Sequence, residues 1–180
     1  MESSSKPHDE LLVAIRKRCA LVKVIGRGTF KAGPSLKRFC TSALAKGCTQ
    51  IIIDMGECVG MDSTFMGVMA GLALRMQREA SGQLVAMNLT PKTSALLSTL
   101  GLDQLVTCYQ ADGELPQAFK TCLVNNLDLE DLDLEGDEKK VSLEVMLEAH
   151  QHLVEASPQN ITRFRDVITY LDQDLKDFDH

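Results

Sequence analysis

The stretch that decides the fold of this chain is residues 50–67, which read QIIIDMGECVGMDSTFMG. Gln50–Met55 is an almost continuous apolar run, and apolarity on both faces of a strand predicts a central position in a sheet. Thr64–Glu79 then carries apolar residues at helical spacing. A buried strand followed by an apolar helix predicts an α/β unit, with Asp62 and Ser63 at the start of the helix.

Outward from this stretch, short apolar runs and amphipathic segments alternate along residues 11–127. Pro34 and Pro91 open two expected helices, and Gly47 and Gly101 follow their ends. The expected strands are Leu11–Ile15, Ala20–Ile25, Gln50–Met55, Leu84–Leu89 and Leu105–Tyr109, and the expected helices are Ser35–Lys46, Thr64–Glu79, Lys92–Leu100 and Leu115–Leu123. This order predicts an α/β fold with a mixed, mainly parallel central sheet flanked by helices.

The C-terminal part of the chain has a different pattern. Seven of the eleven residues in Asp128–Glu138 are acidic, which favours a solvated linker. Val141–Ala156 and Ile161–Lys176 each carry an apolar stripe, and we expect Ser157 to cap the second helix and Pro158 to take its first position. The predicted organisation is a flexible N-terminus over 1–10, one domain over 11–127, an acidic linker over 128–140 and a helical hairpin over 141–180.

The net charge of −6 is unevenly distributed along the chain. Residues 1–127 hold 14 basic and 10 acidic residues, a net charge of +4, whereas residues 128–180 hold 5 and 15, a net charge of −10. The acidic part would repel phosphates, and aromatic residues make up only 4% of the chain. Nucleic acid is therefore not expected as a partner.

Neither a membrane span nor an export signal is expected. The longest nearly apolar run, Phe65–Leu74, falls short of the ~20 residues that a span needs, and residues 1–10 are polar. The six cysteines include no C-x-x-C pair, and several lie in apolar runs, as buried free thiols do. We therefore expect a cytoplasmic protein with no disulfide and no zinc site.

The patterns of nucleotide, metal and catalytic sites are incomplete. The loop Gly26–Gly33 has Lys31 where G-x-G-x-x-G needs its third glycine. His150 and His152 point to different sides of a helix, and no ligand cluster completes a metal site. A serine or cysteine nucleophile needs a base, and residues 11–127 contain no histidine. The prediction is a protein that is not an enzyme and has no cofactor or metal.

The triplet Asp62-Ser63-Thr64 has two interpretations. Each side chain can accept a hydrogen bond from the free N–H groups at a helix start, so capping accounts for all three. The functional alternative is a hydroxyl at the positive end of the helix dipole, where an added phosphate is tolerated electrostatically. Residue types alone favour the cap. The same helix is expected to lie close to the sheet, because it contains the small residues Gly67, Ala70, Gly71 and Ala73.

Two motifs follow each other in a characteristic order. The first is Ile51-Ile52-Ile53-Asp54 with Met61-Asp62-Ser63-Thr64 and Gly67, and the second is Asn88-Leu89-Thr90-Pro91 with Leu96-Leu97 and Leu100-Gly101-Leu102. Together with the elements Val22–Gly26 and Pro34–Leu44, they resemble the STAS domain family, the anti-sigma factor antagonists of bacteria. The resemblance covers about residues 10–125 and leaves the acidic linker and the hairpin outside.

The resemblance implies a cytoplasmic protein that binds another protein in partner-switching control of transcription. In similar members the serine after the aspartate, here Ser63, is phosphorylated. The unphosphorylated form binds an anti-sigma factor that is also a serine kinase, and a phosphatase restores this form. The resemblance further implies that Asp62 fixes the loop, that Thr64 is a second candidate acceptor, and that Thr29 shares the partner-binding surface. Phe65 stands where glycine is commonest in the family.

Other STAS roles remain as alternatives. One is a subunit of a larger signalling or lipid-transport assembly, and another is a nucleotide-binding STAS domain. A lipid-transport subunit usually lacks the acceptor serine, so Ser63 counts against that role. The absence of a phosphate loop with a lysine counts against nucleotide binding.

The predicted hairpin needs a surface that covers its two apolar stripes, because it is too small to be stable alone. The charge difference favours packing on the domain, where Arg16–Arg18, Lys37, Arg38 and Arg75 provide basic side chains. In that arrangement the hairpin restricts the partner surface. Two hairpins from two copies would instead form a four-helix bundle and a homodimer. We also expect a chain that ends at Asn126 to fold without the hairpin.

Overall fold

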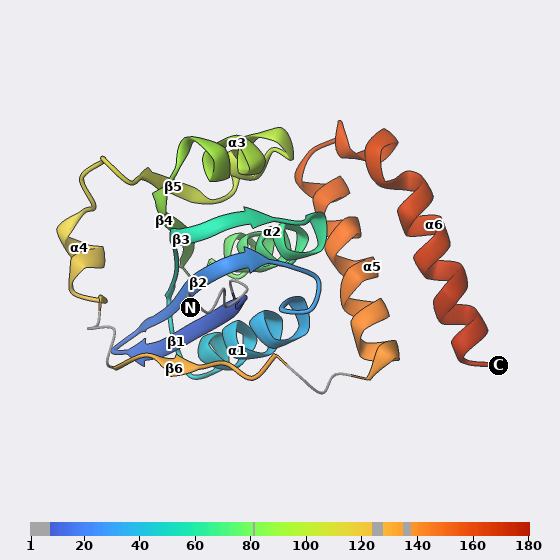
Figure 1. Cartoon of the computed structure of the whole chain (residues 1–180), viewed down its shortest axis with the longest axis horizontal. Coiled ribbons are helices and arrows are strands. Elements are labelled where there is room, and N and C mark those ends of the chain that lie inside the picture. The colour runs from blue at the N-terminus through green and yellow to red at the C-terminus, as the bar shows by residue number, and fades with distance from the viewer. Residues whose placement is uncertain (1–7, 81, 124–127, 135–137) are drawn as a thin grey trace, which may run out of the picture.

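Figure 1 shows the computed structural model, which describes residues 8–80, 82–123, 128–134 and 138–180. Its sheet has six strands in the order β5-β4-β3-β2-β1-β6. The strands are β1 (Glu10–Arg16), β2 (Cys19–Gly28), β3 (Gln50–Met61), β4 (Gln83–Leu89), β5 (Thr107–Gln110) and β6 (Glu130–Asp131). The neighbours from β2 to β5 are parallel, whereas β1 is antiparallel to both β2 and β6. The mixed, mainly parallel sheet is confirmed.

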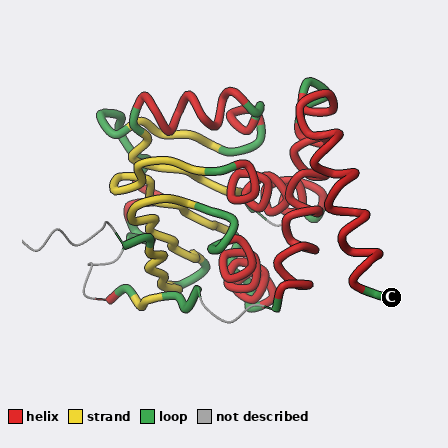
Figure 2. The backbone as a smooth tube through the Cα atoms, turned by 45° about the vertical axis from the view of Figure 1, so that its right-hand side comes forward, coloured by secondary structure: helices red, strands yellow, loops and turns green. Residues whose placement is uncertain are grey.

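The helices form successive layers beside this sheet. They are α1 (Gly33–Ala45), α2 (Ser63–Arg78), α3 (Pro91–Thr99), α4 (Gln117–Lys120), α5 (Lys139–Ala156) and α6 (Asn160–Phe178), with a short 3-10 helix at Leu102–Gln104. Figure 2 shows the order of the layers: the sheet, then α1 and α2, then the hairpin of α5 and α6. Helix α5 packs mainly on α2, and α6 packs on α5. The hairpin therefore lies on the domain as an added helical layer.

Strand β3 separates two apolar clusters, as its two-sided apolarity predicts. Ile51 and Ile53 belong to the large core between the sheet and the helices, and Ile52 belongs to a smaller cluster on the opposite face. That smaller cluster contains Phe119 of α4. The main core extends to the hairpin, because Leu153 and Phe164 are among its buried side chains.

The structure contains a disulfide, and the expectation of none was wrong. Cys19 of β2 and Cys122, which follows α4, are bonded across the less covered face of the sheet, with their Cα atoms 5.8 Å apart. They are separated by 103 positions in sequence, so no local spacing signals the pair. Cys40, Cys48, Cys58 and Cys108 are free. Burial raises the pKa of the Cys40 thiol to about 12, which keeps this cysteine in its unreactive protonated form.

The acidic linker is not simply solvated. Its residues Glu130 and Asp131 form β6, which pairs with β1, and the Leu132 N–H donates to the Leu11 carbonyl at 2.8 Å. Leu132 and Leu134 pack against the core. Leucines on both sides of β6 explain the difference, because Leu129, Leu132 and Leu134 give this acidic segment apolar side chains that pack on the domain. Residues 124–127 and 135–137 of this region lie outside the described residues.

Three other boundaries differ from the sequence prediction. Strand β3 runs on to Met61 because β2 itself extends past the predicted end at Ile25 and pairs with it, with Gly28 opposite Met61. Helix α4 has only four residues, where the prediction had Leu115–Leu123. Helix α6 begins at Asn160 without a side-chain cap, so Ser157 is not its N-cap. In the part of the chain that the structure describes, no helix has the length and apolar character needed to cross a membrane.

Candidate functional site

Asp62 connects the start of α2 with the loop after β2. Its Oδ1 accepts a hydrogen bond from the Phe65 N–H at 2.9 Å, which caps the helix, and its Oδ2 accepts one from the Phe30 N–H at 2.7 Å. The Asp62 N–H also donates to the Gly28 carbonyl at 2.9 Å. One side chain therefore fixes two segments that are about thirty positions apart, in agreement with the predicted loop-fixing role.

The bulky Phe65 fits at this helix start because Gly28 has no side chain. Phe65 is fully buried, and a Cβ atom on Gly28 would lie 2.7 Å from its ring. Gly28 in turn belongs to the last pair of the β2–β3 ladder. The aromatic ring thus points into the core, and Ser63 is still the first residue of the helix.

The predicted site residues lie together but differ in exposure. Ser63 is the first residue of α2 and is half-buried. Thr29 is also half-buried and lies next to Phe30, whose side chain is 44% exposed. Thr64 is buried, with 3% exposure, so its hydroxyl is not on the surface of this conformation. Thr29, Asp62 and Ser63 are therefore half-buried, and only Thr64 of the set is buried.

The partner of Ser63 is His150 of α5, which was not among the predicted site residues. The Ser63 Oγ atom lies 3.0 Å from His150 Nε2, and His150 Nδ1 lies 2.7 Å from the Met146 carbonyl oxygen. A carbonyl oxygen only accepts, so Nδ1 carries a hydrogen and donates to Met146. In the neutral ring Nε2 is then the acceptor, and the Ser63 hydroxyl donates to it.

His150 is held rigidly by both helices of the hairpin. It is 3% exposed, and the ring of Phe164 from α6 packs edge-on against it with centroids 5.2 Å apart. Residues 11–127 contain no histidine, but the tail brings one to Ser63, so the absence of a histidine near this serine was wrongly expected. The available signal was the place of His150 in the helical pattern, next to Ala149 and three positions before Leu153, which are both buried in α5.

Helix α5 lies against α2 where α2 has glycines. A Cβ atom on Gly67 would collide with the carbonyl oxygen of Ala149, and one on Gly71 would collide with the ring of His152. These glycines therefore face α5, and their predicted role in close packing on the sheet was wrong. Both histidines of α5 contact α2, His150 through Ser63 and His152 through Gly71.

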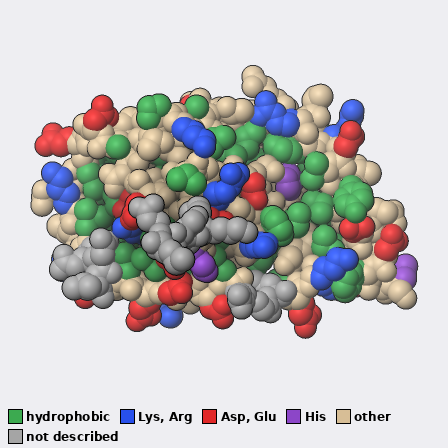
Figure 3. Space-filling model, viewed as in Figure 1, with side chains coloured by type: hydrophobic (Ala, Val, Ile, Leu, Met, Phe, Trp, Pro, Cys, Tyr) green, Lys and Arg blue, Asp and Glu red, His purple; other side chains and the backbone are tan. Residues whose placement is uncertain are grey.

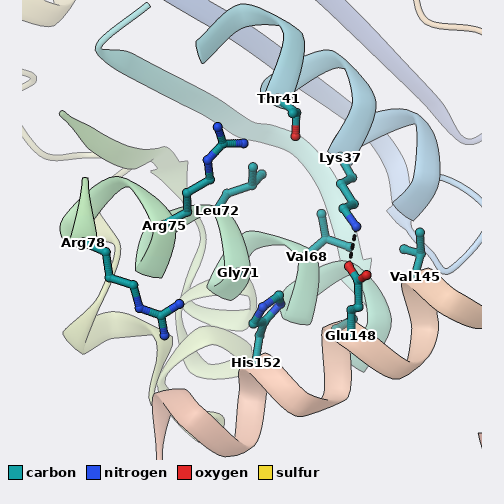
Figure 4. Close-up of a pocket in the computed structure, with 11 residues that line it drawn as sticks. Lys37, Thr41, Val68, Gly71, Leu72, Arg75, Arg78, Val145, Glu148 and His152 are labelled. Carbon is teal, nitrogen blue, oxygen red and sulfur yellow. Dashed lines mark hydrogen bonds and ion pairs between the residues drawn. The ribbon is translucent and has the colours of Figure 1, made fainter. Parts of the chain in front are cut away.

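Basic side chains of α1 and α2 surround this contact, as Figure 4 shows. Lys37 forms an ion pair with Glu148 and Arg78 forms one with Glu155, which joins the basic domain to the acidic hairpin. Lys37 was among the expected contacts. Arg75 instead pairs with Glu79 of its own helix region at 3.0 Å. Two acidic side chains of α5 are therefore paired with basic side chains of the domain.

A cavity of about 270 Å³ lies between α1, α2 and α5, and its lining includes Val68, Leu72 and His152. Burial lowers the pKa of His152, while Glu148 opposes this shift, so the ring tends to be neutral. The cationic groups that line the cavity already have carboxylate partners. Because these cations are already paired, the cavity is better described as a packing gap between helices than as an anion-binding site.

The Ser63–His150 pair has the atoms of a nucleophile and its base, but no substrate cavity is found next to it in the described part of the chain. Neither residue lines the cavity beside α5, and His150 is almost fully buried. A substrate would need space next to Oγ. Among the described residues no group of three or more histidine, cysteine, aspartate or glutamate side chains is placed to hold a metal ion. The arrangement favours a covered hydroxyl over a catalytic centre.

Comparison with known proteins gives a family and a fold. A family model described as "Mlab, STAS domain" matches residues 11–107, just over half of the chain. No protein of curated function matches the sequence. Among solved structures, the chain is similar to an anti-sigma factor antagonist of Mycobacterium paratuberculosis, with 20% identity, a TM-score of 0.51, and coverage of 66% of this chain and 97% of that one.

Two further structures agree in fold. One is the Thermotoga maritima protein TM1081, described as a candidate anti-sigma factor antagonist, with 17% identity, a TM-score of 0.52, and coverage of 61% of this chain and 92% of that one. The other is the anti-sigma factor antagonist SpoIIAA in its unphosphorylated form, with 17% identity, a TM-score of 0.50, and coverage of 61% and 91%. Each match covers nearly all of the known structure but at most two thirds of this chain.

Proposed function

Because the chain belongs to the STAS domain family, we propose that it is an anti-sigma factor antagonist that is switched by phosphorylation of Ser63. The observation that carries the proposal is the position of Ser63 at the first turn of α2, capped by Asp62. A helix start stabilises added negative charge. The same aspartate holds the loop of Thr29, so both segments belong to one partner-binding surface.

In the proposed cycle the unphosphorylated chain binds an anti-sigma factor that is also a serine kinase. The kinase transfers the terminal phosphoryl group of ATP to Ser63 Oγ, ADP leaves, and the hydroxyl proton passes to the base of the kinase. The phosphate adds roughly −1.5 to −2 charges at the centre of the interface. An unmatched interfacial charge costs several kcal/mol, so the partner dissociates without any change of fold. A phosphatase then hydrolyses the ester and restores binding.

This role places the protein in the cytoplasm, and the Cys19–Cys122 bond is the feature that fits this location least. Thiols are generally kept reduced in that compartment. Alkylation of the protein in cells lysed in acid, followed by mass spectrometry, measures the fraction of Cys19 that is oxidised. Complete oxidation of the pair in living cells would argue for another compartment.

The proposal is tested with the full chain as bait in its own host. Ser63→Ala should retain an anti-sigma factor and Ser63→Asp should not, while Ser98→Asp, on the exposed surface of α3, serves as a charge control that retains it. Fragment spectra of the native protein should place one phosphate on Ser63. A phosphate found only on Thr64 or Thr29, or identical partners for both Ser63 variants, would contradict the proposed switch.

A further inference from the structure

Ser63 is not freely accessible, because α5 lies across it. Its Oγ atom donates to His150 Nε2 at 3.0 Å, and His150 is itself 3% exposed beneath Phe164. A kinase that is to reach Oγ needs this hydrogen bond broken and the imidazole ring moved. A partner that is to bind the start of α2 needs the same space. The proposed acceptor is therefore covered by the chain's own tail.

Helix α5 cannot move closer to α2 at Gly67 and Gly71, where the two helices are already in direct contact. The backbone of Ala149 lies directly on Gly67, and His152 fills the space above Gly71. A phosphate on Ser63 would bring three more oxygen atoms to the place where the His150 ring now lies. Close-packed contacts change between discrete arrangements and do not stretch continuously. A phosphate on Ser63 and a docked α5 therefore compete for one volume.

The hairpin is held on the domain by a buried hydrogen bond at its turn and by ion pairs along α5 that each contribute little. Asn160 is only 1% exposed. Its Nδ2 atom donates a hydrogen bond to the Leu100 carbonyl at 2.9 Å, which fixes the turn of the hairpin to the end of α3. The ion pairs of Glu148 and Glu155 join partly exposed side chains, which are weak when measured singly. The surface of α1 and α2 beneath α5 is therefore complementary to a helix that has a small residue opposite Gly67 and acidic residues on either side of it.

We propose that α5 is a displaceable intramolecular cover of the partner-binding face, and that its docking and phosphorylation of Ser63 exclude each other. The closed state keeps kinase and partner away from Ser63. In the open state Ser63, Gly67 and Gly71 become available together. The proposal rests on the proposed function only for the choice of Ser63 as the modified residue.

The test measures hydrogen exchange by mass spectrometry on the full chain with phosphoserine introduced at position 63 during translation. The expected result is that peptides from residues 139–156 exchange roughly 100-fold faster or more than in the unmodified chain. Peptides from β3 and β4 should keep their protection. Unchanged protection of residues 139–156 in the phosphorylated chain overturns the proposal.

Two variants calibrate this measurement. Ala149→Leu inserts a side chain against Gly67 and gives the exchange pattern of a released hairpin, whereas Gln151→Leu, on the exposed side of α5, keeps the closed pattern. If Ala149→Leu also unfolds β3 and β4, the double variant Glu148→Lys/Glu155→Lys replaces it as the open reference. Since the phosphate is introduced without a kinase, failure to find a kinase for Ser63 would refute the proposed function and leave this result unaffected.

Discussion

The two sides of α2 are built differently. Phe65, Met69, Ala73 and Met76 recur at helical spacing on one side, are at most 1% exposed and belong to the main core. Ser63, Gly67 and Gly71 lie on the opposite side and meet α5 through a hydrogen bond and backbone contacts. The first side is a close-packed apolar interior, and the second is a contact between two helices made by one hydrogen bond and by glycines that let the backbones approach. The core side of α2 therefore stabilises the fold of the domain, whereas the side that contacts α5 can lose its contacts without disrupting the core.

The largest effect is expected on the core side. Phe65→Ala removes a fully buried ring under Gly28 and should lower the free energy of unfolding by about 3–5 kcal/mol. Denaturant titration of the full chain measures this loss as a lower midpoint with an unchanged slope. Phe178→Ala, at a side chain that is 47% exposed on α6, is the matched control and should change little. A loss below about 1 kcal/mol for Phe65→Ala would show that the two sides are not distinct.

The second effect concerns the whole interface side. A chain that ends at Asn126 loses the edge strand β6 as well as the hairpin, and loss of the hairpin uncovers Val68 and Leu72 of α2. Full burial of one such side chain contributes about 1.5–3 kcal/mol, so partial exposure of both should cost about 2–5 kcal/mol. The thermal transition should stay cooperative at a lower melting temperature, because the core side is intact. An insoluble or molten product would mean that the hairpin completes the core.

The same truncation addresses oligomeric state. Light scattering on the full chain and on the shortened one tests the alternative four-helix bundle. Figure 3 shows hydrophobic side chains over the hairpin, and α6 exposes Ile161, Val167, Tyr170 and Phe178. A monomer in both cases is expected if the hairpin serves only its own domain. A dimer that becomes a monomer on truncation would indicate that α6 also pairs two copies.

A smaller effect is expected from the hydrogen bond between Ser63 and His150. Ser63→Ala, His150→Ala and the double variant form a cycle whose coupling energy should be about 0.5–1.5 kcal/mol in favour of the closed state. Equilibrium unfolding of the full chain measures all three. The cycle is needed because His150→Ala also removes the contact with Phe164. A coupling energy of zero would mean that the pair is adjacent without stabilising the hairpin.

Local features of the fold could be predicted from the sequence because they depend on neighbouring residues. The apolar run of β3, the cap at Asp62 and the stripes of the hairpin all follow from spacings of one to four positions. Features that depend on distant residues could not. Ser63 and His150 are 87 positions apart, and Cys19 and Cys122 are 103 positions apart.

The glycines of α2 illustrate why the rest was missed. Small residues predict that something comes close to a helix, but not which element does so. Ala70 and Ala73 lie in the main core, whereas Gly67 and Gly71 meet α5. The charge difference between the two parts of the chain indicated the correct partner surface. It could not identify Glu148 and Glu155 among fifteen acidic residues in the tail.

The smallest effect is expected from a single ion pair at the edge of this interface. Lys37 and Glu148 are both partly exposed, with 41% and 48% of their side chains accessible, so solvent and salt screen their attraction. A cycle of Lys37→Met, Glu148→Gln and the double variant should give a coupling energy of about 0.2–1 kcal/mol. The coupling should shrink further in 1 M salt, whereas the Ser63–His150 coupling should change little, because His150 is buried. The matched pair Lys176 and Asp172, which lies within α6 and does not join the hairpin to the domain, is the control for salt effects on α6 alone. A Lys37–Glu148 coupling that exceeds the Ser63–His150 coupling would reverse the ranking and mean that charge, more than the contact at the helix start, keeps the cover closed.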